Sequence, residues 1–413
     1  MPSRLRNVVR RYLPAAHAAH GCVAVVLCSV LVAACGKTDP ALDNDAYVWQ
    51  RRWTPAVTAA MSDSTDLVRA WRVLAADVAP DGKWSDATPA LPALAAAGRP
   101  AIMVLRFDGR VDGLRDAEIH ARIAALRDSW QRAGIALAGV EIDYDCATSK
   151  LPAYTRFLAG LRARLDPSIP LSITALPTWL DSPALAALLA IPDESVLQVH
   201  AVLSPTRGLF DAKRAQDWLD AYAAQTRKPW RVALPAYGSR VAWDDEGRIA
   251  AVESEQPALM PGGRSAELLV TPADMAAFVS RIEDRRPPGL AGIVWFRLPT
   301  RVDARAWSLP TWRAVLARQP LRPALSVSAQ AAAGGARDLI LANAGDADAA
   351  LPFAVRLDGA CAAADGINGY TLERDGLGIY LRRAQEGLLH AGAQRNIGWI
   401  RCEHEPTNLH VQP

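Results

Sequence analysis

Three acidic residues alternate with apolar ones in the segment GVEIDYD, residues 139–145. If this segment is a β-strand, Glu141, Asp143 and Asp145 share one face, because successive side chains point to opposite sides of a strand. Carboxyl groups spaced at about 7 Å on a closed face cannot all ionise cheaply, so at least one should keep its proton near neutral pH. A protonated carboxyl is what a general acid needs.

Two other interpretations of these carboxylates stay open, namely a Ca²⁺ site and a structural cluster of ion pairs with nearby arginines. We favour catalysis or sugar binding over both. The residues Cys402, His404 and His410 lack the spacing of a metal site, and the sequence contains no His-Glu-x-x-His motif. We therefore expect no bound metal and no cofactor. The sequence also lacks a Gly-x-Ser-x-Gly motif, which argues against an ordinary α/β-hydrolase esterase.

Other polar and aromatic side chains near the ends of predicted strands could bind a ligand. Some of them share a strand face, and an aromatic ring among them could stack on a sugar. For each one, packing or hydrogen bonding within the core is the alternative role. These candidates are Trp49, Arg51, Asp108, Gln198, His200, Tyr237 and Trp295.

The elements that must position these residues follow a repeated strand–helix order from residue 46 to residue 318. Apolar residues recur at helical spacing in segments such as 116–132 and 152–165. Eight strands in this rhythm predict a (β/α)8 barrel, whose active sites lie where the strands end. A doubly wound open sheet is the rival, but no Gly-rich dinucleotide loop occurs. The predicted strands are 46–53, 67–77, 100–107, 137–145, 170–176, 195–203, 230–236 and 290–297.

Two further parts interrupt or follow this barrel. The stretch 239–269 is too long for a plain loop, so we expect an inserted hairpin or small subdomain there. The helical rhythm stops at the segment QPLRP, residues 319–323. Residues 324–413 then show short alternating runs separated by Gly, Asn and Asp, which predicts a small β-sandwich-like module.

The N-terminus has the pattern of an export signal. Arginines between residues 4 and 11 precede an apolar run, residues 22–34, that is too short for a convincing membrane span. The sequence VAAC, residues 32–35, is typical of a bacterial lipobox. Residues 1–34 are therefore the predicted signal peptide, and Cys35 is the predicted lipidated residue. An ordinary cleaved signal peptide is the alternative. Residues 35–45 would form the tether, and Gly36 favours sorting to the outer membrane. We therefore expect a lipid-anchored protein of the cell envelope.

Cysteine content and net charge add to this interpretation. In an oxidising compartment we expect Cys361 and Cys402 to form a disulfide, leaving Cys146 as a buried, inert thiol. The chain has 46 Lys and Arg against 43 Asp and Glu, a net charge of +3. Four arginines and no acidic residue lie within residues 1–34, so the remainder carries a net charge of −1. This balance argues against nucleic-acid binding, and we expect a monomer.

Four short motifs resemble the barrel of chitinase-like family 18 glycoside hydrolases. The segment 139–145 resembles the acidic signature of the fourth strand, and the sequences LSITALP, LPAYG and GIVWF resemble the fifth, seventh and eighth strands. Together with the lipobox, the set is similar to a family of bacterial barrel lipoproteins that carry domain of unknown function 3142. The resemblance covers about residues 45–318.

The resemblance implies a glycosidic bond as the target and a polysaccharide or other glycan as the ligand. Asp145 would be the general acid, Asp143 would orient it, Glu141 would be a deeper electrostatic partner and Trp295 the stacking platform. The family's first Asp falls on Ala138, and its catalytic Glu falls on the shorter Asp145. A glycan-binding barrel without catalysis is therefore the alternative function.

Overall fold

The computed structural model describes most of the chain from residue 41 onward. The expected signal peptide, the lipidation site Cys35 and most of the tether lie outside the described residues. None of the helices in the described part is both long and apolar enough to span a membrane. The described residues are 41–111, 113–200, 208–253, 264–358, 361–376, 378–402 and 409–412.

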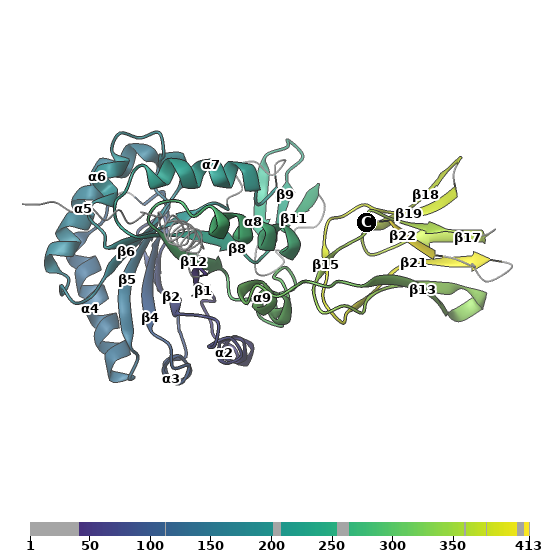
Figure 1. Ribbon diagram of the computed structural model, residues 1–413, viewed down its shortest axis with the longest axis horizontal. Coiled ribbons are helices and arrows are strands. Elements are labelled where there is room, and N and C mark those ends of the chain that lie inside the picture. Colours follow the sequence, from purple (N-terminus) through teal and green to yellow (C-terminus); the bar gives the residue numbers. More distant parts are fainter. Residues whose placement is uncertain are drawn as a thin grey trace, which may run out of the picture. The chain divides into compact units, whose positions relative to one another are not determined.

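Eight parallel strands close into a barrel, which confirms the predicted fold class (Figure 1). Closure depends on the first strand, which pairs in parallel with the last strand on one side and with the second on the other. A short strand, β3 (Trp84–Asp86), pairs antiparallel with the second barrel strand. The barrel strands are β1 (Asp43–Val48), β2 (Ala70–Val78), β4 (Ala101–Phe107), β5 (Leu137–Tyr144), β6 (Leu171–Ala175), β7 (Glu194–Gln198), β8 (Trp230–Pro235) and β12 (Leu290–Phe296).

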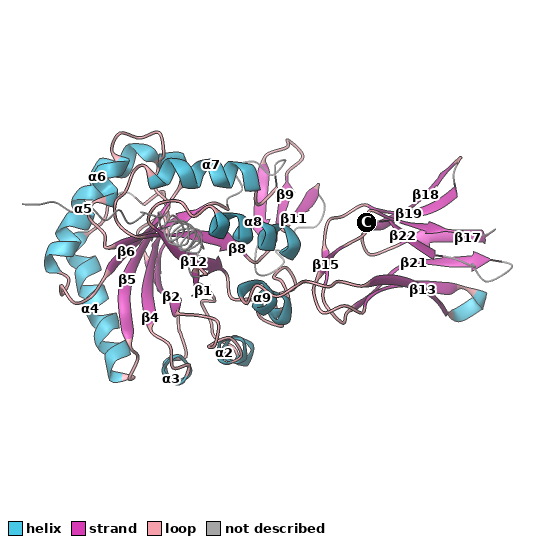
Figure 2. Ribbon diagram, viewed as in Figure 1, coloured by secondary structure: helices cyan, strands magenta, loops and turns pink. Residues whose placement is uncertain are grey.

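One helix follows each strand, so the described chain has the complete (β/α)8 order (Figures 1 and 2). The helices begin where the sequence offers start signals: Pro stands in the first turn of several, and Asp211, Thr271 and Ser308 cap three of them. The helices are α2 (Pro55–Ser62), α3 (Leu91–Ala96), α4 (Asp116–Arg132), α5 (Leu151–Arg164), α6 (Leu185–Leu189), α7 (Ala212–Ala223), α8 (Pro272–Asp284) and α9 (Leu309–Leu316).

Strand alternation divides the buried residues between two regions. Outward-facing side chains such as Val140, Ile142 and Tyr144 pack with the helices in the main hydrophobic core. The barrel interior holds a much smaller apolar cluster, which includes Val104 and Val196. Much of the remaining interior is therefore lined by the polar and charged side chains of the strands, and the candidate site is built from these.

The inserted segment after β8 forms a three-stranded antiparallel sheet. Its central strand is β9 (Ser239–Trp243), flanked by β10 (Ile249–Glu253) and β11 (Ser265–Leu268). Helix α8, which completes the seventh strand–helix unit, begins only after this sheet. The insertion therefore rises from the end of the barrel at which β8 ends.

The residues after α9 form an all-β module, as the change in hydrophobic period predicts. Two four-stranded antiparallel sheets and one two-stranded sheet enclose a separate core that includes Leu339, Leu381 and Ile397. A disulfide joins Cys361 to Cys402, the pair expected from the sequence. The strands are β13 (Leu325–Ala331), β14 (Arg337–Asn343), β15 (Ala349–Ala350), β16 (Ala354–Leu357), β17 (Cys361–Gly366), β18 (Tyr370–Asp375), β19 (Gly378–Arg383), β20 (Leu388–Leu389), β21 (Gln394–Cys402) and β22 (Leu409–Gln412).

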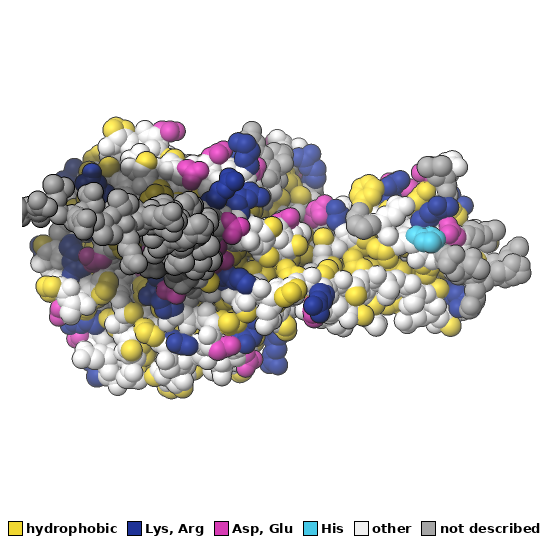
Figure 3. Space-filling model, in the orientation of Figure 1, with side chains coloured by type: hydrophobic (Ala, Val, Ile, Leu, Met, Phe, Trp, Pro, Cys, Tyr) yellow, Lys and Arg dark blue, Asp and Glu magenta, His cyan; other side chains and the backbone are white. Residues whose placement is uncertain are grey.

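The surface mixes both signs of charge. Figure 3 shows Lys and Arg side chains interspersed with Asp and Glu on the visible face. This pattern is what a chain with nearly equal numbers of basic and acidic residues should present.

Candidate active site

Strand β5 carries the three predicted carboxylates at three different depths. Glu141 is fully buried, Asp143 is 3% exposed, and Asp145 lies one residue beyond the strand, where it is exposed. Because parallel strands of a barrel all end at the same side, Asp143 and Asp145 lie toward the end where barrel active sites form. Gly109 allows this loop to come close: a Cβ there would lie only 2.1 Å from the backbone oxygen of Asp145.

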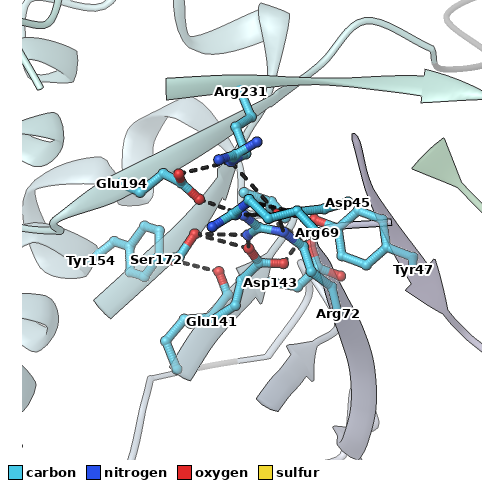
Figure 4. A network of polar contacts seen from close by, with 12 residues as sticks. Asp45, Tyr47, Arg69, Arg72, Glu141, Asp143, Tyr154, Ser172, Glu194 and Arg231 are labelled. Atoms are coloured by element: carbon cyan, nitrogen blue, oxygen red, sulfur yellow. Dashed lines mark hydrogen bonds and ion pairs between the residues drawn. The ribbon is translucent and has the colours of Figure 1, made fainter. Parts of the chain in front are cut away.

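Glu141 is held by three neighbours inside the barrel (Figure 4). The Tyr47 hydroxyl donates to its Oε1 at 2.7 Å, the Ser172 hydroxyl donates to its Oε2 at 2.9 Å, and the Arg72 guanidinium pairs with Oε2. Both oxygens are therefore occupied by protein donors. For this residue the structural ion-pair interpretation fits the geometry better than contact with a ligand.

The ion pairs continue from Glu141 to neighbouring strands inside the barrel (Figure 4). Arg72 pairs with Asp45 and Glu194, and Arg231 donates to Glu194 at 2.8 Å. Burial alone would raise the pKa of the Asp45 carboxyl, but Arg72, Arg231 and Arg69 together hold that pKa below its usual value. Counting Glu141, three guanidinium groups therefore face three carboxylates in this network.

Asp143 and Asp145 have a different environment. Burial is the largest cause that raises the pKa of the Asp143 carboxyl well above its usual value, and the negative charge of Asp145 raises it further. A 2.6 Å hydrogen bond from the Thr174 hydroxyl and the charge of Arg106 oppose this. The pKa of Asp145 is also raised, chiefly because the surrounding protein displaces water from its carboxyl although the residue is exposed at the surface. Both carboxyls therefore hold a proton to higher pH than an ordinary exposed aspartate does.

Arginines connect this pair to the surface. The Nη1 of Arg106 donates to Oδ1 of Asp77 at 3.0 Å, and its Nε lies 3.9 Å from Oδ2 of Asp143. Arg51 donates to the other oxygen of Asp77 at 2.7 Å. The predicted ligand-binding residue Arg51 is thus engaged in an ion pair.

Aromatic rings gather on the opposite side of the barrel end. The half-exposed ring of Phe296 lies 5.2 Å from Trp49, 5.7 Å from Tyr47 and 5.3 Å from Tyr237, all edge-on. The imidazole of His200 stacks on the same ring at 5.2 Å. The structure therefore brings together three of the predicted residues, Trp49, His200 and Tyr237, around a phenyl ring.

One ring nitrogen of His200, Nε2, has no hydrogen-bond partner among the described residues. Its Nδ1 lies 3.4 Å from the Tyr237 hydroxyl, whereas Nε2 is buried and meets no hydrogen-bond partner within the described chain. The residue is 5% exposed, and burial lowers the pKa of its imidazole to about 4. His200 is thus neutral at pH 7 and able to donate or accept one more hydrogen bond.

Two family models match this chain. Residues 97–301 match the model described as domain of unknown function DUF3142, from just before β4 to just after β12. This match covers just under half of the chain. Residues 326–403, within the C-terminal module, match a second model, domain of unknown function DUF8456.

The chain is also similar to solved structures at low identity. The spore cortex-lytic enzyme SleL of Bacillus cereus is 14% identical, with 67% of this chain and 74% of that one covered and a TM-score of 0.48. A chitinase of Chromobacterium violaceum is 15% identical, with 67% and 98% covered and a TM-score of 0.48. A class V chitinase of Pseudomonas fluorescens is 14% identical, with 67% and 99% covered and a TM-score of 0.46. No curated protein matches the sequence.

One predicted ligand-binding residue lies elsewhere. Trp295 was expected to face the barrel interior, but it points outward and is fully buried in the core under the helices. Its indole donates to Oδ1 of Asn44 at 3.0 Å and lies 6.1 Å from Trp307. The expectation fails because the inward positions of β12 are those of Val294 and Phe296.

The two remaining predicted residues, Asp108 and Gln198, lie at the same end of the barrel and differ in how far neighbouring side chains engage them. Asp108 pairs with Arg110, and the hydrogen bonds from that residue lower the pKa of Asp108 to about 2. Gln198 ends β7 and is half-buried. In the described part of the chain, no group of three or more His, Cys, Asp or Glu side chains could hold a metal ion.

Sequence reasoning missed Asp77 and Phe296. A register shift between Leu74 and Ala76, where β2 pairs with β4, marks a β-bulge, and it turns Asp77 inward against the alternation of the strand. Nothing in the local sequence of β2 signals this bulge. Phe296 could have been found by shifting the assumed inward face of β12 by one residue.

Proposed function

We propose that the barrel binds a glycan where its strands end and hydrolyses a glycosidic bond there. The observation that carries this proposal is the juxtaposition of Asp143 and Asp145 at that end, with half-exposed aromatic rings at the same end. Sugar rings present C–H faces that pack on aromatic side chains, and a glycosidic oxygen needs a proton when it leaves. The aromatic rings can pack on a sugar, and the acid pair can supply the proton.

In this proposal the bond between the anomeric carbon and the glycosidic oxygen breaks as Asp145 donates its proton to that oxygen. The anomeric carbon gains the hydroxyl of a water molecule, and the remaining proton of that water restores the protonated Asp145. Asp143 orients Asp145. The Thr174 hydroxyl fixes the Asp143 carboxyl, and the two carboxyls interact electrostatically. The rings of Phe296 and Trp49 form the platform. This assignment replaces the expected platform Trp295.

His200 and Gln198 complete the ligand contacts. The buried Nε2 of His200 has no described partner, so a sugar hydroxyl or carbonyl would satisfy it. Buried polar atoms cost free energy when unpaired, which favours a bound group at this position. Gln198 ends the same strand and offers both an amide donor and an acceptor.

A glycan array paired with product analysis tests the proposal. Wild-type protein should bind at least one glycan and cleave it, whereas Asp145→Asn should bind the same glycan with at least about 100-fold slower cleavage, the scale of a lost general acid. Asp245→Asn, an exposed carboxylate in the turn after β9, is the matched control and should behave as wild type. Binding by wild type and Asp145→Asn without product from either would instead establish a glycan-binding barrel, in which the short Asp145 does not reach the glycosidic oxygen.

We also propose that the mature protein is a monomeric lipoprotein of the cell envelope, anchored through Cys35. The support is the lipobox and the basic and apolar segments that precede it. In cells fed a clickable fatty acid, wild-type protein should be labelled and should fractionate with the outer membrane. Cys35→Ser should lose the label, and unchanged fractionation of this variant would contradict the anchor.

A further inference from the structure

The bulge in β2 has a specific result at the proposed active site. Trp71, Val73 and Ala75 alternate toward the helices, but the next helix-facing residue is Val78. The extra residue between them turns Asp77 toward the barrel interior, where it is 9% exposed. Bulges of this kind are frequent beside active sites because they re-aim a side chain.

Asp77 uses both oxygens to hold arginines. Oδ1 accepts from Arg106 at 3.0 Å and Oδ2 accepts from Arg51 at 2.7 Å. Arg106 also faces Asp143, but its Nε stays 3.9 Å from the nearer carboxyl oxygen, beyond hydrogen-bond distance. Arg106 therefore makes its short contact with Asp77 and its longer contact with Asp143.

We propose that Arg106 is a positioning residue for Asp143 and Asp145, and that Asp77 sets how strongly its charge acts on them. This inference rests on the proposed function, in which these two carboxyls do the proton transfer. Arg106 acts through Asp143 and Asp145 and is given no contact with the substrate.

The groups that face the acid pair fix the sign of this effect. Asp143 is surrounded by the charges of Glu141, Asp145 and Arg106 and by the hydroxyl of Thr174. Asp145 is influenced by Arg106 and by Asp108 on the loop after β4. Tyr47 on β1 and Tyr154 on α5 also interact with Asp143, but both are uncharged at neutral pH because burial raises the pKa of each phenol well above its usual value.

Among the described residues, Arg106 is thus a cation that acts on both carboxyls. Its removal should make the pair harder to ionise, so that the pKa of each rises. Neutralising Asp77 should do the opposite, because the guanidinium loses its closest anion and its positive charge then acts more fully on Asp143. A contact that serves only to hold the fold, without acting on the acid pair, would leave both titrations unchanged.

The test is a side-chain carboxyl titration of the full chain by NMR, using aspartate labelled with ¹³C and detergent to hold any lipid anchor. Asp143→Asn and Asp145→Asn assign the two resonances. We expect Arg106→Met to shift their titration to higher pH, Arg106→Lys to restore part of the shift, and Asp77→Asn to move it to lower pH. Arg382→Met is the matched control, since Arg382 has a similar exposure and also pairs with two carboxylates, Glu373 and Asp375, in the C-terminal module.

The outcomes separate this inference from the proposed function. Opposite shifts with no glycan cleaved by wild type would support the role of Arg106 and refute hydrolysis. Cleavage by wild type with no shift in any variant, or with shifts of the same sign in Arg106→Met and Asp77→Asn, would refute the role of Arg106. Circular dichroism of each variant identifies those that fail to fold. If Arg106→Met fails to fold, Arg106→Lys supplies the comparison, and its titration should depart from that of wild type by a small shift to higher pH.

Discussion

The Tyr47 hydroxyl donates a 2.7 Å hydrogen bond to Oε1 of Glu141, which links the first barrel strand to the fourth across the interior. Arg72 from the second strand meets the other oxygen of the same carboxylate. With Ser172 of β6 as its third partner, the fully buried Glu141 therefore connects four barrel strands. Its negative charge balances an arginine that is itself fully buried.

Glu141→Gln should reduce stability more than it affects chemistry. The substitution leaves the Arg72 guanidinium without one of its buried carboxylates, and breaking such a pair costs about 3–5 kcal/mol. Urea unfolding followed by tryptophan fluorescence measures the free energy of unfolding. An unchanged unfolding midpoint together with loss of glycan cleavage would contradict the structural role and indicate a catalytic one.

Asp143→Asn should stabilise the protein at neutral pH. The pKa of the Asp143 carboxyl is raised in the folded state, so folding favours its protonated form. That preference contributes stability below the unfolded pKa of about 3.9 and is lost as the pH rises through the higher folded pKa. Asn imitates the protonated form, so thermal unfolding should show the variant to be more stable at pH 7 but not at pH 3.5. A variant less stable than wild type at pH 7 would be the contrary result.

His200→Gln should lessen the sensitivity of the protein to mild acid. Burial lowers the pKa of the imidazole to about 4 in the folded state, whereas an exposed His titrates near about 6.5. Between these values the unfolded chain takes up a proton that the folded chain does not, so wild-type stability falls as the pH decreases. Unfolding curves from pH 7 to pH 4.5 should show a shallower decline for the variant. The exposed His410, replaced in His410→Gln, is the control and should follow wild type.

Two glycine substitutions should have opposite effects. A Cβ at Gly292 would lie 2.0 Å from Nη1 of Arg231 and 2.7 Å from the backbone oxygen of Asp43, so Gly292→Ala should cost at least about 1–3 kcal/mol. Gly160 lies inside α5, and the nearest atom to a Cβ there would be 3.7 Å away. Gly160→Ala should therefore gain roughly 0.5–1 kcal/mol from helix propensity. Thermal unfolding measures both, and equal effects would show that the space around Arg231 is not limiting.

The sequence was sufficient to predict the barrel because its signals are local. Strand–helix alternation is visible in hydrophobic periodicity, and so is the change to short alternating runs after residue 323. The placement of Asp143 and Asp145 at the end of β5 follows from period-two alternation within one strand. These parts of the prediction needed no knowledge of distant contacts.

The rest of the site depends on pairing between strands. The bulge that turns Asp77 inward becomes visible only in the register of β2 with β4. The inward face of β12 could not be chosen from a run as apolar as LAGIVWF, so the sequence does not show that Phe296 faces the interior in place of Trp295. That Glu141 is committed to Tyr47 and Arg72 likewise depends on strands that are distant in sequence.

The pairing of β1 with β12 also constrains when the protein can fold during its synthesis. Strand β1 has only one barrel neighbour close in sequence, β2, and its other edge stays unpaired until Leu290–Phe296 has been synthesised. Contacts between such distant segments form slowly, and a nascent chain that waits for them exposes apolar strands that can aggregate. A chain of this design should depend on a chaperone that shields β1 and the following strands until β12 is available to pair with β1.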